Sequence, residues 1–206
     1  MGSRLQSRKG QSAIGMVVVM LIILALMGAS VILTYNGLVK AEKTVEESWA
    51  QIATVLQRRF DLIPNLIETV KGYAAHERQT LEAVTAARAA ANDAVMAVGG
   101  KWAEGGMAQI AATQAGLSAA MRSLFALVEN YPNLKASSNF MALQDQFEGT
   151  ENRIAVARQR YNSAVKVYNT RTETFPGVFI APMFGFGERE SWEAEEKAYE
   201  APRAEF

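Results

Sequence analysis

The chain has no cysteine and one histidine in 206 residues, and its 21 basic and 21 acidic residues balance. Without cysteine, no disulfide holds the fold, which is compatible with either side of a membrane. A transition-metal site would have to be completed by carboxylates, so we expect no metal. The balanced charge gives no basic face that would bind nucleic acid.

Motifs for catalysis and phosphate binding are also missing. His76-Glu77 begins like a zinc-protease helix, but Thr80 stands where that signature needs its second histidine. No serine lies in a G-x-S-x-G frame, and a histidine-dependent triad could use only His76. The glycine-rich stretch 99–106 lacks a GK[ST] ending. We therefore expect no enzyme, no cofactor and no small-molecule substrate.

One long apolar run is present. Ala13 to Leu33 carries no charge and would span roughly 31 Å as a helix, which matches the hydrocarbon core of a bilayer. The alternative is a cleaved signal peptide, whose apolar region is usually about 7–15 residues long. The run is longer than that, and only residues 28–30 form a small-residue cluster suited to cleavage. We predict a retained transmembrane helix over 13–33 after a short basic tail, 1–12.

The charges beside this run predict its orientation. Arg4, Arg8 and Lys9 precede it, whereas Lys40 and Lys43 follow it among glutamates. Counting basic residues favours a cytoplasmic N-terminus and an extracytoplasmic remainder. Removing the first three from the 21 basic residues leaves 18 against 21 acidic ones, a net charge of −3.

Apolar residues then recur at helical spacing in four stretches. We expect the first helix to continue out of the membrane and to end or kink sharply at Pro64. The second apolar stripe begins near Leu66, includes Tyr73 and stops at the glycine-rich stretch, and the third helix ends at Tyr131-Pro132. The third stripe consists of Met107, Ile110, Gln114, Leu117, Met121, Leu124 and Val128. The fourth consists of Phe140, Leu143, Phe147, Ile154, Ala157, Tyr161, Val165 and Tyr168. Ser137, Ser138 or Asn139 can cap the fourth. The sequence predicts an all-α fold with an antiparallel up-and-down four-helix bundle over 34–174.

Residues 175–206 form a separate region, with an aromatic, glycine- and proline-containing segment before an acidic tail. Residues 175–187 carry no charge. They fit either an irregular segment packed across the bundle end or a loop in the membrane interface, because antiparallel order returns the fourth helix to the membrane. The candidate interface residues are Tyr35, Tyr168, Phe175, Phe179, Phe184 and Phe186.

Polar residues gather in QRRFDLIPNLIETVKGYAAHE (57–77) and TENRIAVARQRYN (150–162). The candidates are Arg58, Arg59, Asp61, Asn65, Glu68, Lys71, His76, Glu77, Glu151 and Arg158. They fit an active site, or helix corners with exposed ion pairs that contribute little energy, and we favour the second. Pairing in the core between Glu151's helix face and the Arg59/Asp61 corner is a further possibility.

Several of these segments resemble the LemA family of bacterial membrane proteins. The matching stretches are YNGLV (35–39), the segment through Trp49, residues 57–77, ENYPNLKAS (129–137), residues 143–162, VYN (167–169) and FPG (175–177). They cover most of the chain outside the anchor and keep their order. The C-terminal APRAEF departs from the family pattern.

The resemblance implies a single-span protein of the bacterial cytoplasmic membrane with an up-and-down bundle, and no established enzymatic activity. We predict a membrane-anchored, non-enzymatic scaffold or interaction protein that self-associates or binds another membrane protein and takes part in membrane or envelope organisation. The alternatives are an accessory subunit of a membrane protease or transporter, and an envelope enzyme using Arg59, Asp61, His76 and Glu77.

Overall fold

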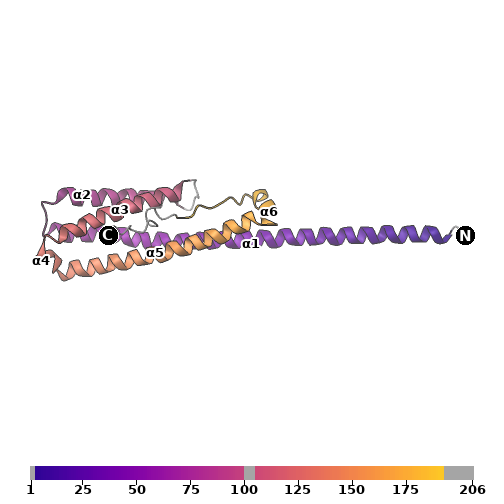
Figure 1. The fold of residues 1–206 in the computed structure, drawn as a ribbon, viewed down its shortest axis with the longest axis horizontal. Helices are drawn as coiled ribbons and strands as arrows, with labels where there is room; N and C mark the ends of the chain where they lie inside the picture. The colour runs from indigo at the N-terminus through magenta and orange to yellow at the C-terminus, as the bar shows by residue number, and fades with distance from the viewer. Residues whose placement is uncertain (1–2, 100–104, 193–206) are drawn as a thin grey trace, which may run out of the picture. The chain divides into compact units, whose positions relative to one another are not determined.

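The structure, a computed structural model, describes residues 3–99 and 105–192. All regular secondary structure in these ranges is helical (Figure 1). The helices are α1 (Ser3–Lys71), α2 (Arg78–Val98), α3 (Gly106–Val128), α4 (Pro132–Lys135), α5 (Ser138–Glu173) and α6 (Gly177–Met183). The predicted all-α class is confirmed.

The chain divides into two compact units. Unit 1 comprises residues 1–43 and 167–188, and unit 2 comprises residues 44–166 and 189–206. Helices α1 and α5 each contribute residues to both units.

Unit 2 buries the apolar stripes that the sequence predicts. On α3, every member of the expected stripe is buried: Met107, Ile110, Gln114, Leu117, Met121, Leu124 and Val128. Aromatic rings pack between the helices as well. Phe125 of α3 lies edge-on to Phe140 and Phe147 of α5, and Trp49 of α1 lies edge-on to Tyr161 of α5. These contacts join α1, α3 and α5, while α2 packs along α3 (Figure 1).

The sequence predicts that the first helix ends or kinks sharply at Pro64. The helix does not end there, because α1 continues to Lys71. A proline inside a helix leaves the carbonyl four residues earlier without its N–H partner. That carbonyl belongs to Phe60, and it accepts a hydrogen bond from Arg88 Nε of α2 at 2.7 Å. Leu66, expected on the second helix, therefore belongs to α1.

The turn between α1 and α2 lies at residues 72–77, where Tyr73 is exposed instead of belonging to the second apolar stripe. The glycine-rich stretch begins as expected. Gly99 has φ 36° and Gly105 has φ 78°, a backbone conformation that favours glycine. Gly99 ends α2, and Gly105 precedes α3.

Unit 1 differs from unit 2 in its surface. The large apolar residues of α1 between Met16 and Leu33 have exposed fractions from 39% to 72%. This part of α1 is long and apolar enough to cross a membrane, and none of it is buried in the protein. Beyond it, a small core joins Leu38 of α1 to Ile180 and Ala181 of α6, with Phe186 packed against them. The aromatic segment 175–187 thus contains a short helix.

Candidate functional site

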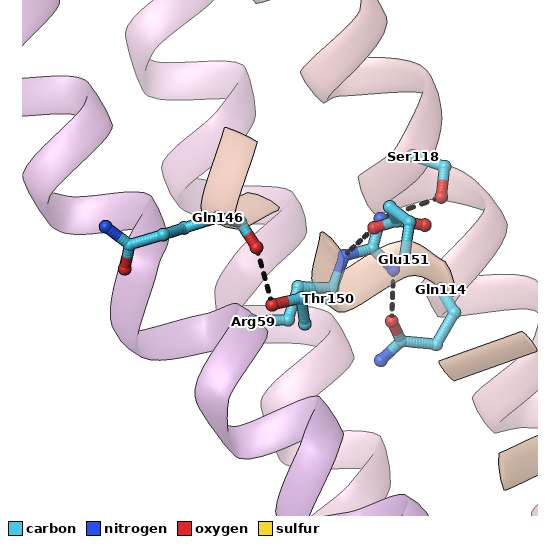
Figure 2. A network of polar contacts seen from close by, with 6 residues as sticks. All are labelled: Arg59, Gln114, Ser118, Gln146, Thr150 and Glu151. Atoms are coloured by element: carbon cyan, nitrogen blue, oxygen red, sulfur yellow. Dashed lines mark hydrogen bonds and ion pairs between the residues drawn. The ribbon is translucent and has the colours of Figure 1, made fainter. Parts of the chain in front are cut away.

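Among the charged residues that the structure describes, Arg59 of α1 is the most deeply buried, with 2% of its surface exposed. Its Nη1 donates to Gln114 Oε1 at 2.8 Å, and its Nη2 donates to Ser118 Oγ at 2.8 Å (Figure 2). Its Nε lies 2.8 Å from Glu151 Oε1. The geometry of this third contact is that of an ion pair and not of an aligned hydrogen bond. We call these four residues, from α1, α3 and α5, the Arg59 cluster.

Two neighbours on α5 complete the surroundings of Arg59. The guanidinium carbon lies 5.3 Å from the centre of the Phe147 ring, within the range of a cation–π contact. Thr150 is buried, but its hydroxyl donates to the Gln146 carbonyl of its own helix at 2.8 Å (Figure 2). Phe147 is therefore the neighbour that contributes to holding the arginine.

Burial and ion pairing have opposite effects on the pKa values of Arg59 and Glu151. Burial lowers the pKa of Arg59, while the nearby Glu151 carboxylate raises it. The ordinary pKa of an arginine lies so far above neutral pH that the side chain stays protonated. Burial likewise raises the pKa of Glu151, and Arg59 partly offsets this. The Glu151 side chain remains 38% exposed, so water reaches the acidic member of the pair and not the basic one.

The chemistry open to the Arg59 cluster is narrow. Arginine does not release a proton at physiological pH, and Gln114 does not titrate. Ser118 accepts a hydrogen bond from Arg59, and the one carboxylate of the cluster, Glu151, is paired with the same arginine. Within the described residues, no group of three or more His, Asp or Glu side chains could hold a metal ion. The arrangement suits a polar connection between three helices.

Of the ten predicted polar residues, the Arg59 cluster contains two, Arg59 and Glu151. Three others form local contacts within α1. Asp61 accepts from Gln57 one turn away, and Glu68 pairs with Lys71. Those placed outside the cluster and exposed to solvent are Arg58, Asp61, Asn65, Glu68, Lys71 and His76, while Arg158 is half-buried.

Glu77, the last of the ten, links two turns of unit 2. Its carboxylate accepts a hydrogen bond from the Tyr131 hydroxyl at 2.9 Å. This hydrogen bond is the main reason that the pKa of Tyr131 is raised. Glu77 therefore joins the α1–α2 turn to the residue before α4, far from Arg59 along the chain.

Sequence reasoning missed a strap formed by residues 189–192, which is fixed to two helices of unit 2. The Glu190 carboxylate accepts from the backbone N–H groups of Gly105 and Met107 at the start of α3, where an anion is favoured. The Glu190 carbonyl accepts from the Tyr161 hydroxyl at 2.8 Å, and burial raises the pKa of that phenol. Asn162 makes two hydrogen bonds with the backbone of Trp192, which is buried.

No local pattern marks this strap, because its partners are backbone and side-chain groups distant in sequence. Gln114 did carry a signal, since it is a polar residue in an otherwise apolar stripe. Such a residue needs a buried partner, and the helix register supplies Arg59.

The candidate membrane-interface residues all belong to unit 1, but they differ in exposure. Phe175, Phe179 and Phe184 are 81%, 67% and 51% exposed, and Tyr35 is 38% exposed. Phe186 is half-buried. Tyr168 is fully buried and donates its hydroxyl hydrogen to the Gly187 carbonyl at 2.9 Å. Tyr168 thus holds the segment to α5, and the phenylalanines form the outer surface.

The model of the LemA family matches residues 48–206. The chain is 26% identical over 174 residues to magnetosome proteins MamQ 1 and MamQ 2 of Paramagnetospirillum magneticum, covering 77% of this chain. It is 24% identical over 173 residues, 76% of its length, to magnetosome protein MamQ of Magnetospirillum gryphiswaldense. The match spans 64% of the length of each relative.

Proposed function

The chain belongs to the LemA family, and from this premise we propose that it is a membrane-anchored helical scaffold that self-associates and takes part in organising a membrane or the cell envelope. In this proposal unit 2 performs no catalysis and serves for interaction. The N-terminus is cytoplasmic and unit 2 is extracytoplasmic, as the flanking charges favour. The relatives that this chain resembles are named as magnetosome proteins.

The exposed apolar surface of α1 is the observation that carries this proposal. Its large side chains from Met16 to Leu33 are at least 39% exposed, and no charged residue interrupts them. Such a surface is unfavourable in water and is satisfied by lipid. The second support is the Arg59 cluster, whose hydrogen bonds serve contacts between helices.

Self-association has a candidate face on the anchor. Ala25, Gly28 and Ala29 lie on one side of α1, and a side chain added at Gly28 would meet nothing within 4 Å. Small residues allow two membrane helices to approach closely. We expect Gly28→Leu to weaken self-association in native gels of mild-detergent extracts at native expression. Ser30→Leu is the matched control, since position 30 points about 200° away on a helix of 3.6 residues per turn. A single 22.5 kDa species for the unchanged chain would contradict self-association.

Binding to a different membrane protein is separated from self-association by crosslinking in cells. A groove of about 530 Å³ on unit 2 lies between α1 and α5, with Gln51, Val55, Val156 and Arg160 among its lining residues. A photo-crosslinker at Gln51, followed by mass spectrometry, should yield adducts with the same chain. Adducts with a protease or transporter would instead favour an accessory subunit.

The enzymatic alternative makes a different prediction. His76 is exposed in the turn before α2, and Asp61 bonds to Gln57 on α1. If unit 2 only mediates interaction, His76→Ala and Asp61→Asn should each leave abundance, self-association and cellular phenotype unchanged. Loss of the phenotype with unchanged abundance and fold would support the envelope enzyme.

A further inference from the structure

We propose that the outer face of α6 lies in the membrane interface, so that unit 1 contacts the bilayer at two places, the anchor and this short helix. The inference deepens the proposed function and rests on it, because it takes residues 13–33 as the span. The occupant of the apolar α6 surface is the lipid bilayer next to the anchor, and not another protein.

The first step is the depth of α6 relative to the anchor. Leu33, the last residue of the predicted span, and Phe175 line the same hollow of about 310 Å³. The Tyr35 ring lies 4.9 Å from the Phe184 ring between centres, and Leu38 packs against Ile180. From Leu33 to Leu38 the helix rises only about 7.5 Å. With the run in the hydrocarbon core, α6 therefore lies at the level of the lipid headgroups.

The second step is that α6 is held in one orientation. Arg171 of α5 donates from Nη1 to the Gly37 carbonyl of α1 at 2.8 Å. A Cβ at Gly177 would lie 1.9 Å from the Arg171 carbonyl oxygen, so only glycine allows this approach. With Ile180 and Ala181 buried against Leu38, the opposite face of α6 must point outward.

The third step is the chemistry of that outward face. Phe175, Val178, Phe179, Met183 and Phe184 are between 43% and 81% exposed. The Phe175 and Phe179 rings contact each other, with centres 6.3 Å apart. Within the described part of unit 2, the exposed large apolar residues lie apart in the sequence, in the α1–α2 turn, on α2 and at two distant positions of α5: Tyr73, Met96, Met141 and Val156.

The surroundings of this face favour lipid over a second protein surface. No charged residue interrupts positions 175–187, and the face continues the exposed apolar surface that ends at Leu33 and Tyr35. Aromatic side chains are enriched at the interface between membrane and water. Arg171 lines the same hollow as Leu33, where a guanidinium group suits the headgroup phosphates.

The absence of cysteine allows a direct test with single-cysteine variants of the full chain, each labelled with the fluorophore NBD. Phe179→Cys reports α6, Leu24→Cys reports the anchor, and Met96→Cys, 64% exposed on α2, is the matched control for an exposed apolar position. The labelled proteins are placed in phosphatidylcholine–phosphatidylglycerol vesicles that carry a nitroxide at carbon 5 or carbon 12 of the acyl chain.

We expect the label at Phe179 to be quenched at least twofold more by the carbon-5 than by the carbon-12 nitroxide. The label at Leu24 should show the reverse order, and the label at Met96 should be quenched by neither. Quenching at Leu24 without quenching at Phe179 would overturn the inference and leave the proposed anchor standing. No quenching at Leu24 would overturn the anchor itself. Blue-shifted emission from the label at Phe179 that neither nitroxide quenches would also overturn the inference about α6. It would indicate that this face contacts a second copy of the chain.

Discussion

Units 1 and 2 place charge and apolar surface in opposite ways. Unit 2 encloses a charged group, Arg59, and turns its apolar stripes inward. Unit 1 leaves exposed the large apolar residues from Met16 to Leu33 and the phenylalanines on and beside α6, Phe175, Phe179 and Phe184. An interior arginine is tolerated only when its hydrogen bonds are made inside the protein, and an exposed apolar surface only when the surrounding phase is apolar. Two units of one chain are therefore suited to two different environments.

The largest expected effect concerns the interior of unit 2. Arg59→Ala leaves Glu151 without its counter-charge and Gln114 and Ser118 without their donor, and we expect a loss of about 3–5 kcal/mol in the free energy of unfolding. Arg59→Met restores apolar volume and should lose less, because Glu151 can be hydrated at its exposed edge. Urea unfolding of the full chain in mild detergent, followed by circular dichroism, measures both. A loss below about 1 kcal/mol for Arg59→Ala would show that the buried arginine contributes little to unit 2.

The corresponding change in unit 1 is Gly177→Ala. The added Cβ collides with backbone, so α6 must move, at an expected cost of about 1–3 kcal/mol. Hydrogen exchange should become faster in α6 and stay unchanged in α3. Gly116→Ala on α3, where nothing lies within 4 Å of the added atom, is the control and should be neutral or slightly stabilising. Equal exchange changes in both units would mean that the units do not respond separately.

A third prediction tests how α1 continues past Pro64. Arg88→Met leaves the Phe60 carbonyl without its donor and should cost about 1–3 kcal/mol. Pro64→Ala restores a backbone N–H at position 64 that can serve the same carbonyl. In that background we expect Arg88→Met to cost about 1 kcal/mol less. A double-mutant cycle from urea unfolding measures this coupling, and additive losses would exclude it.

The smallest expected effect is the pH dependence of Glu151. Because burial raises the pKa of this carboxyl, the folded protein binds its proton more tightly than the unfolded chain does. Its contribution to stability therefore grows as the pH falls from neutral through the raised pKa, and it levels off below the ordinary value of about 4.3. Relative to Glu151→Gln, the unchanged protein should gain less than about 1 kcal/mol between pH 7 and pH 4, since the side chain is partly exposed and screened. A loss of stability relative to Glu151→Gln over this pH range would contradict the prediction.

Much of the fold was predictable because it follows local periodicity. The stripe on α3 was predicted residue by residue, and every member is buried. The fourth stripe, from Phe140 to Tyr168, is buried apart from the half-buried Leu143. Periodicity works here because each helix buries one face, and spacing alone defines that face.

The failures share a different cause. Pro64 was expected to end or sharply kink a helix, but α1 continues, and Arg88 from another helix supplies the donor that the Phe60 carbonyl lacks. Arg59 and Asp61 were equivalent candidates in the same polar stretch of the sequence. Because of their positions on the helix, Arg59 points into the interior and Asp61 points to solvent. The strap through Glu190 depends on backbone groups of α3 that no local motif identifies.

The sequence by itself determined that the protein is helical and carries one uncharged run long enough to span a bilayer, because composition and spacing are properties of neighbouring residues. Only the tertiary structure decided which polar residue enters the interior and which phenylalanines point outward. Those outcomes depend on how helices distant in sequence meet, and a side chain's environment exists only after they have packed.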